Sequence, residues 1–215
     1  AFVNKLDRAG ADFYFVVNEM KDKLGCVPVP IQVPIGSESN FQGVVDLVTM
    51  KAQIWREDDN NFGMNYDTVE IPEEYQETAE KYRDQMLEII AENDETLFEK
   101  YFDDPSTITE DEINNALRTA TINMSIVPVM AGTAYKNKGV QPLLNSIANY
   151  LPSPLDMPPI EGYNPKTEEH EVRKPDVNEP FSALAFKIMT DPYMGRLAYF
   201  RVYSGHLDSG SYVLN

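Results

Sequence analysis

Cysteine and histidine are scarce in this sequence, and their scarcity excludes several kinds of site. Cys26 is the single cysteine among the 215 residues, so no internal disulfide can form. The two histidines, His170 and His206, lie too far apart in the sequence for the spacing of a metal site. We therefore predict no metal site, and a lone cysteine is consistent with a reducing compartment such as the cytoplasm.

Long apolar runs are also missing. No stretch of about 18 or more apolar residues occurs, which excludes a membrane-spanning helix of ordinary length. The sequence opens Ala1-Phe2-Val3, without an initiator methionine, a basic region or an apolar leader, so we predict no signal peptide. Both ends have the composition of strands. We expect the chain to be a piece of a longer, monomeric cytoplasmic protein with no membrane contact.

Basic residues are nearly absent from one long segment. Residues 57–112 contain 20 acidic and three basic side chains, and the resulting net charge of −17 equals that of the whole chain. Such a surface repels phosphate backbones, so we do not expect this segment to bind nucleic acid directly. Two interpretations are open at this point: a surface for a basic protein partner, and a solvated surface that keeps the protein soluble.

One order of elements occurs twice along the chain. An apolar strand, a loop and a helix with apolar residues at helical spacing occupy 1–24, and the same order returns over 126–151. Strand-loop-helix units are typical of α/β domains. The intervening segment has short β-rich runs followed by helical patterns, and we interpret it as an inserted α+β subdomain. The helices expected within it span 72–91, 94–102 and 109–123.

The amino-acid composition changes after residue 152. Residues 153–179 are rich in proline, glutamate and lysine and show no period, which predicts a linker. Beyond it, β-rich runs at 181–189, 197–203 and 212–214 predict the start of an all-β barrel domain. The predicted division is 1–27 and 124–152 for the α/β domain, 28–123 for the inserted subdomain, 153–179 for the linker and 180–215 for the all-β part.

Four residues after the first strand suggest a specific chemistry. Asn4-Lys5-Leu6-Asp7 resembles the Asn-Lys-x-Asp base-recognition loop of the GTPase superfamily. Guanine presents two adjacent N–H donors, and the carboxylate of Asp7 can accept both in a fork. Adenine has no donor pair at those positions, so the carboxylate would lose its partners. The resemblance implies that the stem of Lys5 lies over the base and that the Asn4 side chain ties neighbouring loops together.

A second loop stands where the superfamily has another guanine contact. Gly132-Thr133-Ala134 follows the strand expected over 126–130, and the superfamily usually has Ser-Ala at the last two positions. Thr133 departs from serine but keeps the hydroxyl, and Ala134 matches. The resemblance implies that the backbone N–H of Ala134 contacts the guanine carbonyl. The candidate guanine-binding residues are therefore Asn4, Lys5, Leu6, Asp7, Thr133 and Ala134.

Longer stretches resemble the elongation factor G family of ribosomal translocase GTPases over essentially the whole chain. The resemblance implies the C-terminal part of a P-loop GTPase domain, interrupted by a G′ subdomain and followed by the beginning of domain II. It also implies a parent that acts in protein biosynthesis, promoting GTP-dependent translocation of tRNA and mRNA on the ribosome. The stretches are FVNKLDR at 2–8, FQGVVDL at 41–47, KNKGVQ at 136–141, YLPSP at 150–154 and FSALAFK at 181–187.

The sequence contains no Gly-x4-Gly-Lys-Ser/Thr phosphate loop. In the family this loop precedes the point where the present sequence begins, and it contributes to holding the phosphates and Mg²⁺. We therefore expect the parent to bind GTP or GDP with Mg²⁺ and to hydrolyse GTP. The fragment has no catalytic residue of its own, and base contacts alone bind on the order of mM or worse. We expect it to be inactive in isolation and to hold no nucleotide tightly.

An acidic helix face is the remaining candidate site. Along 72–91, apolar residues recur at helical spacing on one face and acidic residues line much of the rest. The resemblance implies that the G′ subdomain contacts the C-terminal domain of the ribosomal stalk protein, whereas contacts with ribosomal RNA lie mostly in parts outside this sequence. Two alternatives are an interaction module with vestigial nucleotide loops and a fragment of a related ribosome-recycling or ribosomal-protection GTPase. The candidate docking residues are Glu73, Glu77, Glu80 and Asp84.

Overall fold

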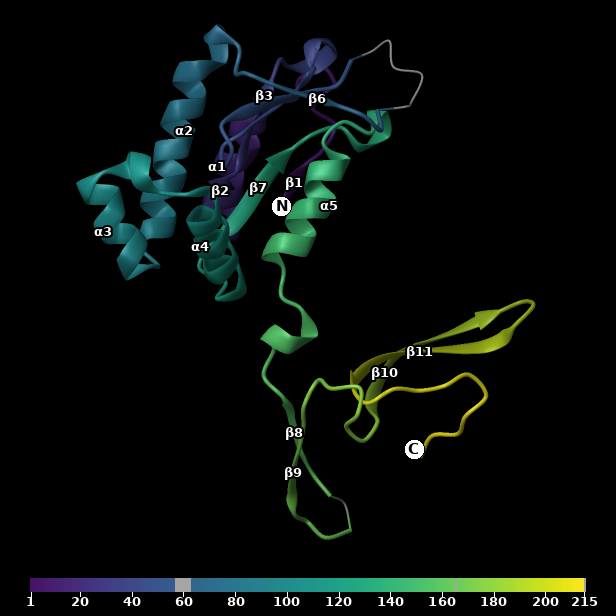
Figure 1. Cartoon of the computed structure of the whole chain (residues 1–215). Helices are drawn as coiled ribbons and strands as arrows, with labels where there is room; N and C mark the ends of the chain where they lie inside the picture. The colour runs from purple at the N-terminus through teal and green to yellow at the C-terminus, as the bar shows by residue number, and fades with distance from the viewer. Residues whose placement is uncertain (57–62, 165, 215) are drawn as a thin grey trace. The chain divides into compact units, whose positions relative to one another are not determined.

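The structure is a computed structural model that describes residues 1–56, 63–164 and 166–214, so the start of the acidic segment 57–112 lies outside the described residues. The chain divides into two compact units, Ala1–Leu151 and Pro152–Asn215. The first unit is mixed α/β, and strands are the main regular elements described in the second (Figure 1). None of the described helices combines the length and apolar character needed to cross a membrane.

The first unit contains a parallel sheet. Its strand order is β1 (Phe2–Val3), β7 (Val127–Ala131) and β2 (Pro28–Pro30), and both outer strands run parallel to β7. We predicted that the inserted subdomain begins at Pro28, but these three residues form an edge strand of the parallel sheet. Proline has no N–H to donate, and an edge strand tolerates that loss on its open side.

An antiparallel sheet follows β2 in the chain. Its strands pair in sequence order, each with the next. Three of them coincide with predicted β-rich runs. The fourth, β6, was not predicted because its three residues are all exposed and show no apolar alternation. The strands are β3 (Gln32–Ile35), β4 (Gly43–Asp46), β5 (Lys51–Ile54) and β6 (Asp67–Val69).

The expected helices form, with boundaries within two residues of the predicted ones. Helix α4 begins with a capping box, in which Thr109 accepts the N–H of Glu112 and the Glu112 carboxylate accepts the N–H of Thr109. Helix α1 ends at Gly25, whose φ of 63° lies in the left-handed region that glycine adopts without steric cost. The helices are α1 (Phe13–Leu24), α2 (Glu73–Ala91), α3 (Glu95–Asp103), α4 (Glu110–Ile122) and α5 (Val140–Tyr150).

Two hydrophobic clusters stabilise the first unit. The larger one packs the inner faces of α2 and α4 against the sheets, with residues such as Val33, Met86 and Ile113 fully buried. The smaller one joins the beginning of the chain to the antiparallel sheet. It contains Val3, Leu6, Phe13, Phe41, Val44, Trp55, Val129 and Ala131. The segment predicted as an insertion therefore shares a core with the loop that follows β1.

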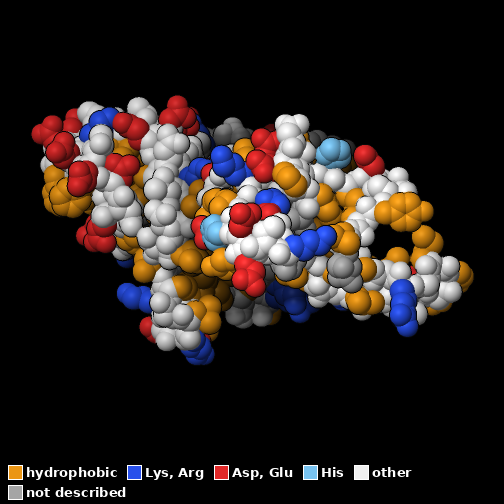
Figure 2. All heavy atoms as spheres, turned by 90° about the horizontal axis from the view of Figure 1, so that it is seen from below, with side chains coloured by type: hydrophobic (Ala, Val, Ile, Leu, Met, Phe, Trp, Pro, Cys, Tyr) orange, Lys and Arg blue, Asp and Glu red, His pale blue; other side chains and the backbone are white. Residues whose placement is uncertain are grey.

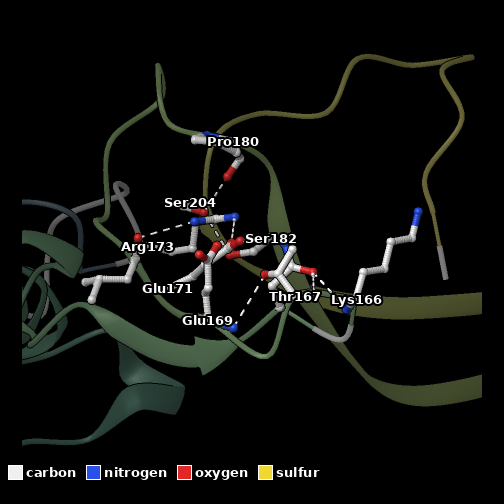
Figure 3. A network of polar contacts seen from close by, with 10 residues as sticks. Lys166, Thr167, Glu169, Glu171, Arg173, Pro180, Ser182 and Ser204 are labelled. Atoms are coloured by element: carbon white, nitrogen blue, oxygen red, sulfur yellow. Dashed lines mark hydrogen bonds and ion pairs between the residues drawn. The ribbon is translucent and has the colours of Figure 1, made fainter.

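The second unit contains two antiparallel hairpins. Strands β8 (Ile160–Tyr163) and β9 (His170–Arg173) form one, and β10 (Ser182–Asp191) and β11 (Gly195–Ser204) form the other. Polar contacts close the base of the second hairpin, where the hydroxyl oxygens of Ser182 and Ser204 lie 2.7 Å apart. Ser204 Oγ also donates to the Pro180 carbonyl at 2.6 Å (Figure 3).

The structure differs from two predictions for the second unit. Residues 153–179, predicted as a linker without regular structure, contain the β8–β9 hairpin. Its largely exposed strands carry charged residues, so no apolar alternation marked them. Residues 212–214, predicted as a strand, have no regular structure, and no described strand pairs with them. The predicted fold class, an α/β unit followed by β-structure, is confirmed.

Candidate functional site

The loops that follow β1 and β7 lie side by side. Because the two strands are parallel neighbours, both loops leave the sheet at the same edge, where ligands bind in open α/β sheets. Backbone hydrogen bonds connect them directly: Gly132 N donates to Val3 O at 3.1 Å, and Leu6 N donates to Gly132 O at 3.2 Å. The predicted residues of the two loops, far apart in sequence, thus lie close together.

Asp7 is held from the opposite loop. Thr133 Oγ1 donates to Asp7 Oδ1 at 2.7 Å, and Lys136 Nζ lies 3.5 Å from Asp7 Oδ2. The Thr133 hydrogen bond lowers the pKa of the Asp7 carboxyl below its ordinary value, and the Lys136 ammonium acts in the same direction. Asp7 is therefore ionised at neutral pH, and a carboxylate with roughly four lone-pair positions keeps free positions for further donors.

Asn4 links the two loops through its side-chain oxygen. Asn4 Oδ1 accepts the N–H of Lys5 at 2.8 Å and the N–H of Ala134 at 2.9 Å. The N–H that we expected to contact the guanine carbonyl is thus engaged with Asn4 in this structure. It would have to be shared between the two acceptors, or released by Asn4, for that contact to form.

Lys5 and Leu6 have opposite environments. Lys5 is exposed, and its φ of 65° is uncommon for a residue with a Cβ; such conformations concentrate at functional loops. Leu6 is 4% exposed and packs in the smaller hydrophobic cluster. Leu6 therefore anchors the loop, whereas the side chain of Lys5 is free to lie over a ligand.

The second loop has an internal structure that the sequence did not indicate. Thr133 and Lys138 exchange two backbone hydrogen bonds, and between them a 3₁₀ turn over Ala134–Lys136 ends at Asn137, whose φ is 56°. This turn places Lys136 beside Asp7. We did not predict a role for Lys136, although it begins the stretch KNKGVQ at 136–141 that resembles the family.

These residues fit the edge of a guanine base. An ionised carboxylate accepts hydrogen bonds and donates none, which matches two adjacent N–H donors and rejects a base that presents acceptors there. The Asp7 side chain is 17% exposed, so a base can reach it in a partly desolvated setting. Within the described residues, no group of three or more His, Cys, Asp or Glu is placed to hold a metal ion.

The candidate docking residues lie on the outer face of α2. Glu73, Glu77, Glu80 and Asp84 are exposed, while residues of the opposite face, such as Met86 and Ile90, are buried. Tyr101 of α3 donates to Asp84 Oδ1 at 3.0 Å, which ties one of the four to the neighbouring helix. Acidic side chains gather on the part of the first unit that contains α2 and α3 (Figure 2).

Comparisons with known proteins place the chain in a family and a fold. The model of the elongation factor Tu GTP binding domain family matches residues 1–153. An elongation factor G from Amoebophilus asiaticus (strain 5a2) is 61% identical over 214 residues, which are 100% of this chain and 30% of that protein. A crystal structure of a protein from Thermus thermophilus matches this chain with a TM-score of 0.73 and 29% sequence identity. The match covers 98% of this chain and 28% of the Thermus thermophilus chain. The chain thus spans about a third of the length of these relatives.

Proposed function

The chain belongs to the elongation factor Tu GTP binding domain family, and from this membership we propose that it is the guanine-recognising part of a translational GTPase. The parent would be an elongation factor of the G type that uses GTP to move tRNA and mRNA through the ribosome in the cytoplasm. The single observation that supports base recognition most strongly is the ionised carboxylate of Asp7, held by the hydroxyl of Thr133 across two loops.

In the parent, this chain would recognise the base and another part would hold the phosphates. Asp7 selects guanine through its two N–H donors, Lys5 covers the base, and Asn4 keeps the two loops together. The phosphates and Mg²⁺ would be held by a phosphate loop, which this sequence does not contain. The purified 215-residue chain should therefore release no phosphate from GTP above the rate in buffer. Turnover by the chain alone would contradict this division.

Guanine selection is tested by equilibrium titration of the intact parent protein with fluorescent GDP and fluorescent ADP. The structure predicts that GDP binds at least about a hundredfold more tightly than ADP, because adenine leaves the Asp7 carboxylate without donors. Equal affinity for the two nucleotides would show that the loops do not select the base, and would leave an interaction module as the better account.

The acidic face of α2 supports a second role for the same protein, the docking of a basic partner. By resemblance to the elongation factor G family, we propose the C-terminal domain of the ribosomal stalk protein as that partner. Neutralising the four exposed acids should weaken binding of the purified stalk domain, most clearly at low salt, where surface charges are least screened. The residues to change to glutamine or asparagine are Glu73, Glu77, Glu80 and Asp84.

A matched control neutralises four exposed acids on the second unit, Glu161, Glu168, Glu169 and Asp208. The control protein has the same net charge as the α2 variant, so a difference between the two reports the α2 face itself. Stalk-domain binding that is equal in the wild type, the α2 variant and the control would exclude docking at this face.

A further inference from the structure

The segment between β3 and β4, residues 36–41, forms hydrogen bonds with Gly10, just after the first guanine loop, and with Lys138, just after the second, and we call this segment the brace. We propose that the brace positions the two loops for guanine binding, with Glu38 and Lys138 as positioning residues. This inference rests on the proposed function, because it explains how the guanine loops are held. It adds that the inserted part of the chain is a component of the base site, in addition to any role in docking.

The first loop is held by Glu38. Gly10, three residues after Asp7, donates its N–H to Glu38 Oε1 at 2.7 Å. Glu38 has a φ of 51°, a conformation that residues with a Cβ adopt rarely and that is kept where surrounding contacts require it. The brace itself is a compact turn, since Asn40 N donates to Ser37 O and Phe41 N donates to Glu38 O. Glu38 therefore accepts a hydrogen bond from the segment that follows the first loop, and a compact turn holds its backbone.

The second loop is held by Lys138. This residue is only 6% exposed, and its Nζ donates to the backbone oxygen of Phe41 at 3.1 Å. A buried ammonium is kept only where hydrogen bonds compensate for its lost hydration. The backbone of Lys138 is paired with that of Thr133, the residue that holds the Asp7 carboxylate. A chain of contacts thus runs from the brace through Lys138 and Thr133 to Asp7.

Apolar packing completes the brace. The side chain of Phe41 is 2% exposed and belongs to the same cluster as Leu6, the anchor of the first guanine loop. A further contact lies nearby: Gln141 Nε2 donates to the backbone oxygens of Gly63 and Met64 at 2.9 and 3.0 Å. Residues of the insertion therefore contact both guanine loops, or the segments that directly continue them, at several points.

These contacts should raise the affinity for the nucleotide, because a site that is already ordered before the ligand binds loses less conformational entropy on binding. With the brace intact, the two loops are already aligned on each other and on Asp7. When one brace contact is removed, the loop must become ordered as the nucleotide binds, and this ordering lowers the affinity. One lost hydrogen bond typically corresponds to a change of about threefold to tenfold in an equilibrium or rate constant.

The experiment measures the dissociation rate of fluorescent GDP from the intact parent protein, beside its thermal unfolding midpoint. Glu38→Ala removes the acceptor for Gly10, whereas Glu38→Gln keeps an acceptor oxygen at the same position. The control is Glu70→Ala, which removes an exposed ion pair to Lys51 elsewhere on the antiparallel sheet. We expect Glu38→Ala to raise the dissociation rate about threefold to tenfold, Glu38→Gln to restore it, and Glu70→Ala to leave it unchanged.

Lys138→Met is the second variant, and it should also raise the dissociation rate. If Lys138→Met does not fold, the comparison of Glu38→Ala with Glu38→Gln still tests the brace, because Glu38 is exposed and its replacement leaves the core intact. Dissociation rates for Glu38→Ala and Glu38→Gln that both equal the wild-type rate would overturn the brace while guanine selection by the wild type stands. A wild type that binds GDP and ADP equally would overturn the proposed function, and the brace with it.

Discussion

The hydroxyl of Thr133 donates a 2.7 Å hydrogen bond to the carboxylate of Asp7, although 126 positions separate the two residues in the sequence. The contact exists because β1 and β7 are parallel neighbours and their loops leave the sheet at one edge. Thr133 is 1% exposed, so water has little access to its hydroxyl as an alternative hydrogen-bond partner. Thr133, in the loop after β7, therefore orients the carboxylate of Asp7, in the loop after β1.

Replacing Thr133 separates the hydroxyl from the side-chain shape. Thr133→Val keeps the volume and removes the donor, so GDP affinity of the intact parent should fall about fivefold to tenfold. The pKa of Asp7 should rise toward its ordinary value, since the largest cause of its lowering is lost. Thr133→Ser keeps the hydroxyl and should retain both properties. GDP titration and NMR titration of the Asp7 carboxyl check this, and equal behaviour of the two variants would contradict it.

Gly132 has no room for a side chain. A Cβ at this position would lie 2.5 Å from the backbone oxygen of Lys138 and 2.6 Å from Cζ of Phe2. Gly132→Ala should therefore displace the second loop and lower the free energy of unfolding by about 1–3 kcal/mol, the usual cost of overpacking. Urea unfolding followed by the fluorescence of Trp55, the single tryptophan, reports on this unit.

Gly162 provides the matched control for that substitution. Its φ is not in the left-handed region, and a Cβ there would have no neighbour within 4 Å. Gly162→Ala should leave both GDP affinity and the Trp55 transition unchanged. An equal loss in the two variants would show that the crowding around Gly132 is not the cause.

Asp46 gives the chain a pH dependence. Burial raises the pKa of Asp46, even though Oδ1 accepts the N–H groups of Val48 and Thr49. The folded state then keeps the proton at pH values where the unfolded state has lost it. The free energy of unfolding should therefore fall as pH rises from the ordinary aspartate pKa through the raised one.

Asp46→Asn should remove this dependence, because the substituted side chain does not ionise. The carboxamide keeps one acceptor oxygen for the N–H groups of Val48 and Thr49. Between the ordinary aspartate pKa and the raised one, the free energy of unfolding of the variant should stay constant while that of the wild type falls. Urea unfolding at several pH values checks the sign, and a variant that loses stability as the pH rises would contradict it.

Elements with a strong apolar period could be predicted from the sequence, and weakly patterned ones could not. The helix at 72–91 was predicted to within two residues because apolar residues such as Ala79 and Met86, both buried, recur at helical spacing. Strand β6 and the β8–β9 hairpin are largely exposed, so pairing alone defines them and no local pattern reveals it. Tyr212 and Leu214 have strand-forming side chains but no partner strand among the described residues.

The residues of the candidate site could be proposed from the sequence, but most of their contacts could not. Asn4, Asp7 and Thr133 could be picked out because a short motif and the hydrogen-bonding needs of guanine point to them. That Asn4 accepts the N–H of Ala134, and that Lys136 lies beside Asp7, depends on the 3₁₀ turn after Thr133. The link from Gly10 to Glu38 depends on the packing of the antiparallel sheet against β1, which no local pattern records.

The most direct test of guanine selection is the substitution Asp7→Asn in the intact parent. A carboxylate accepts from both N–H donors of guanine, whereas a carboxamide presents one acceptor and one donor, which match the N–H and carbonyl of xanthine. We predict that the affinity of the variant for GDP is about a hundredfold lower than that of the wild type. We also predict that the variant binds xanthosine diphosphate (XDP) more tightly than GDP. A variant that retains the wild-type preference for GDP over XDP would contradict the assignment of Asp7 as the residue that reads the base.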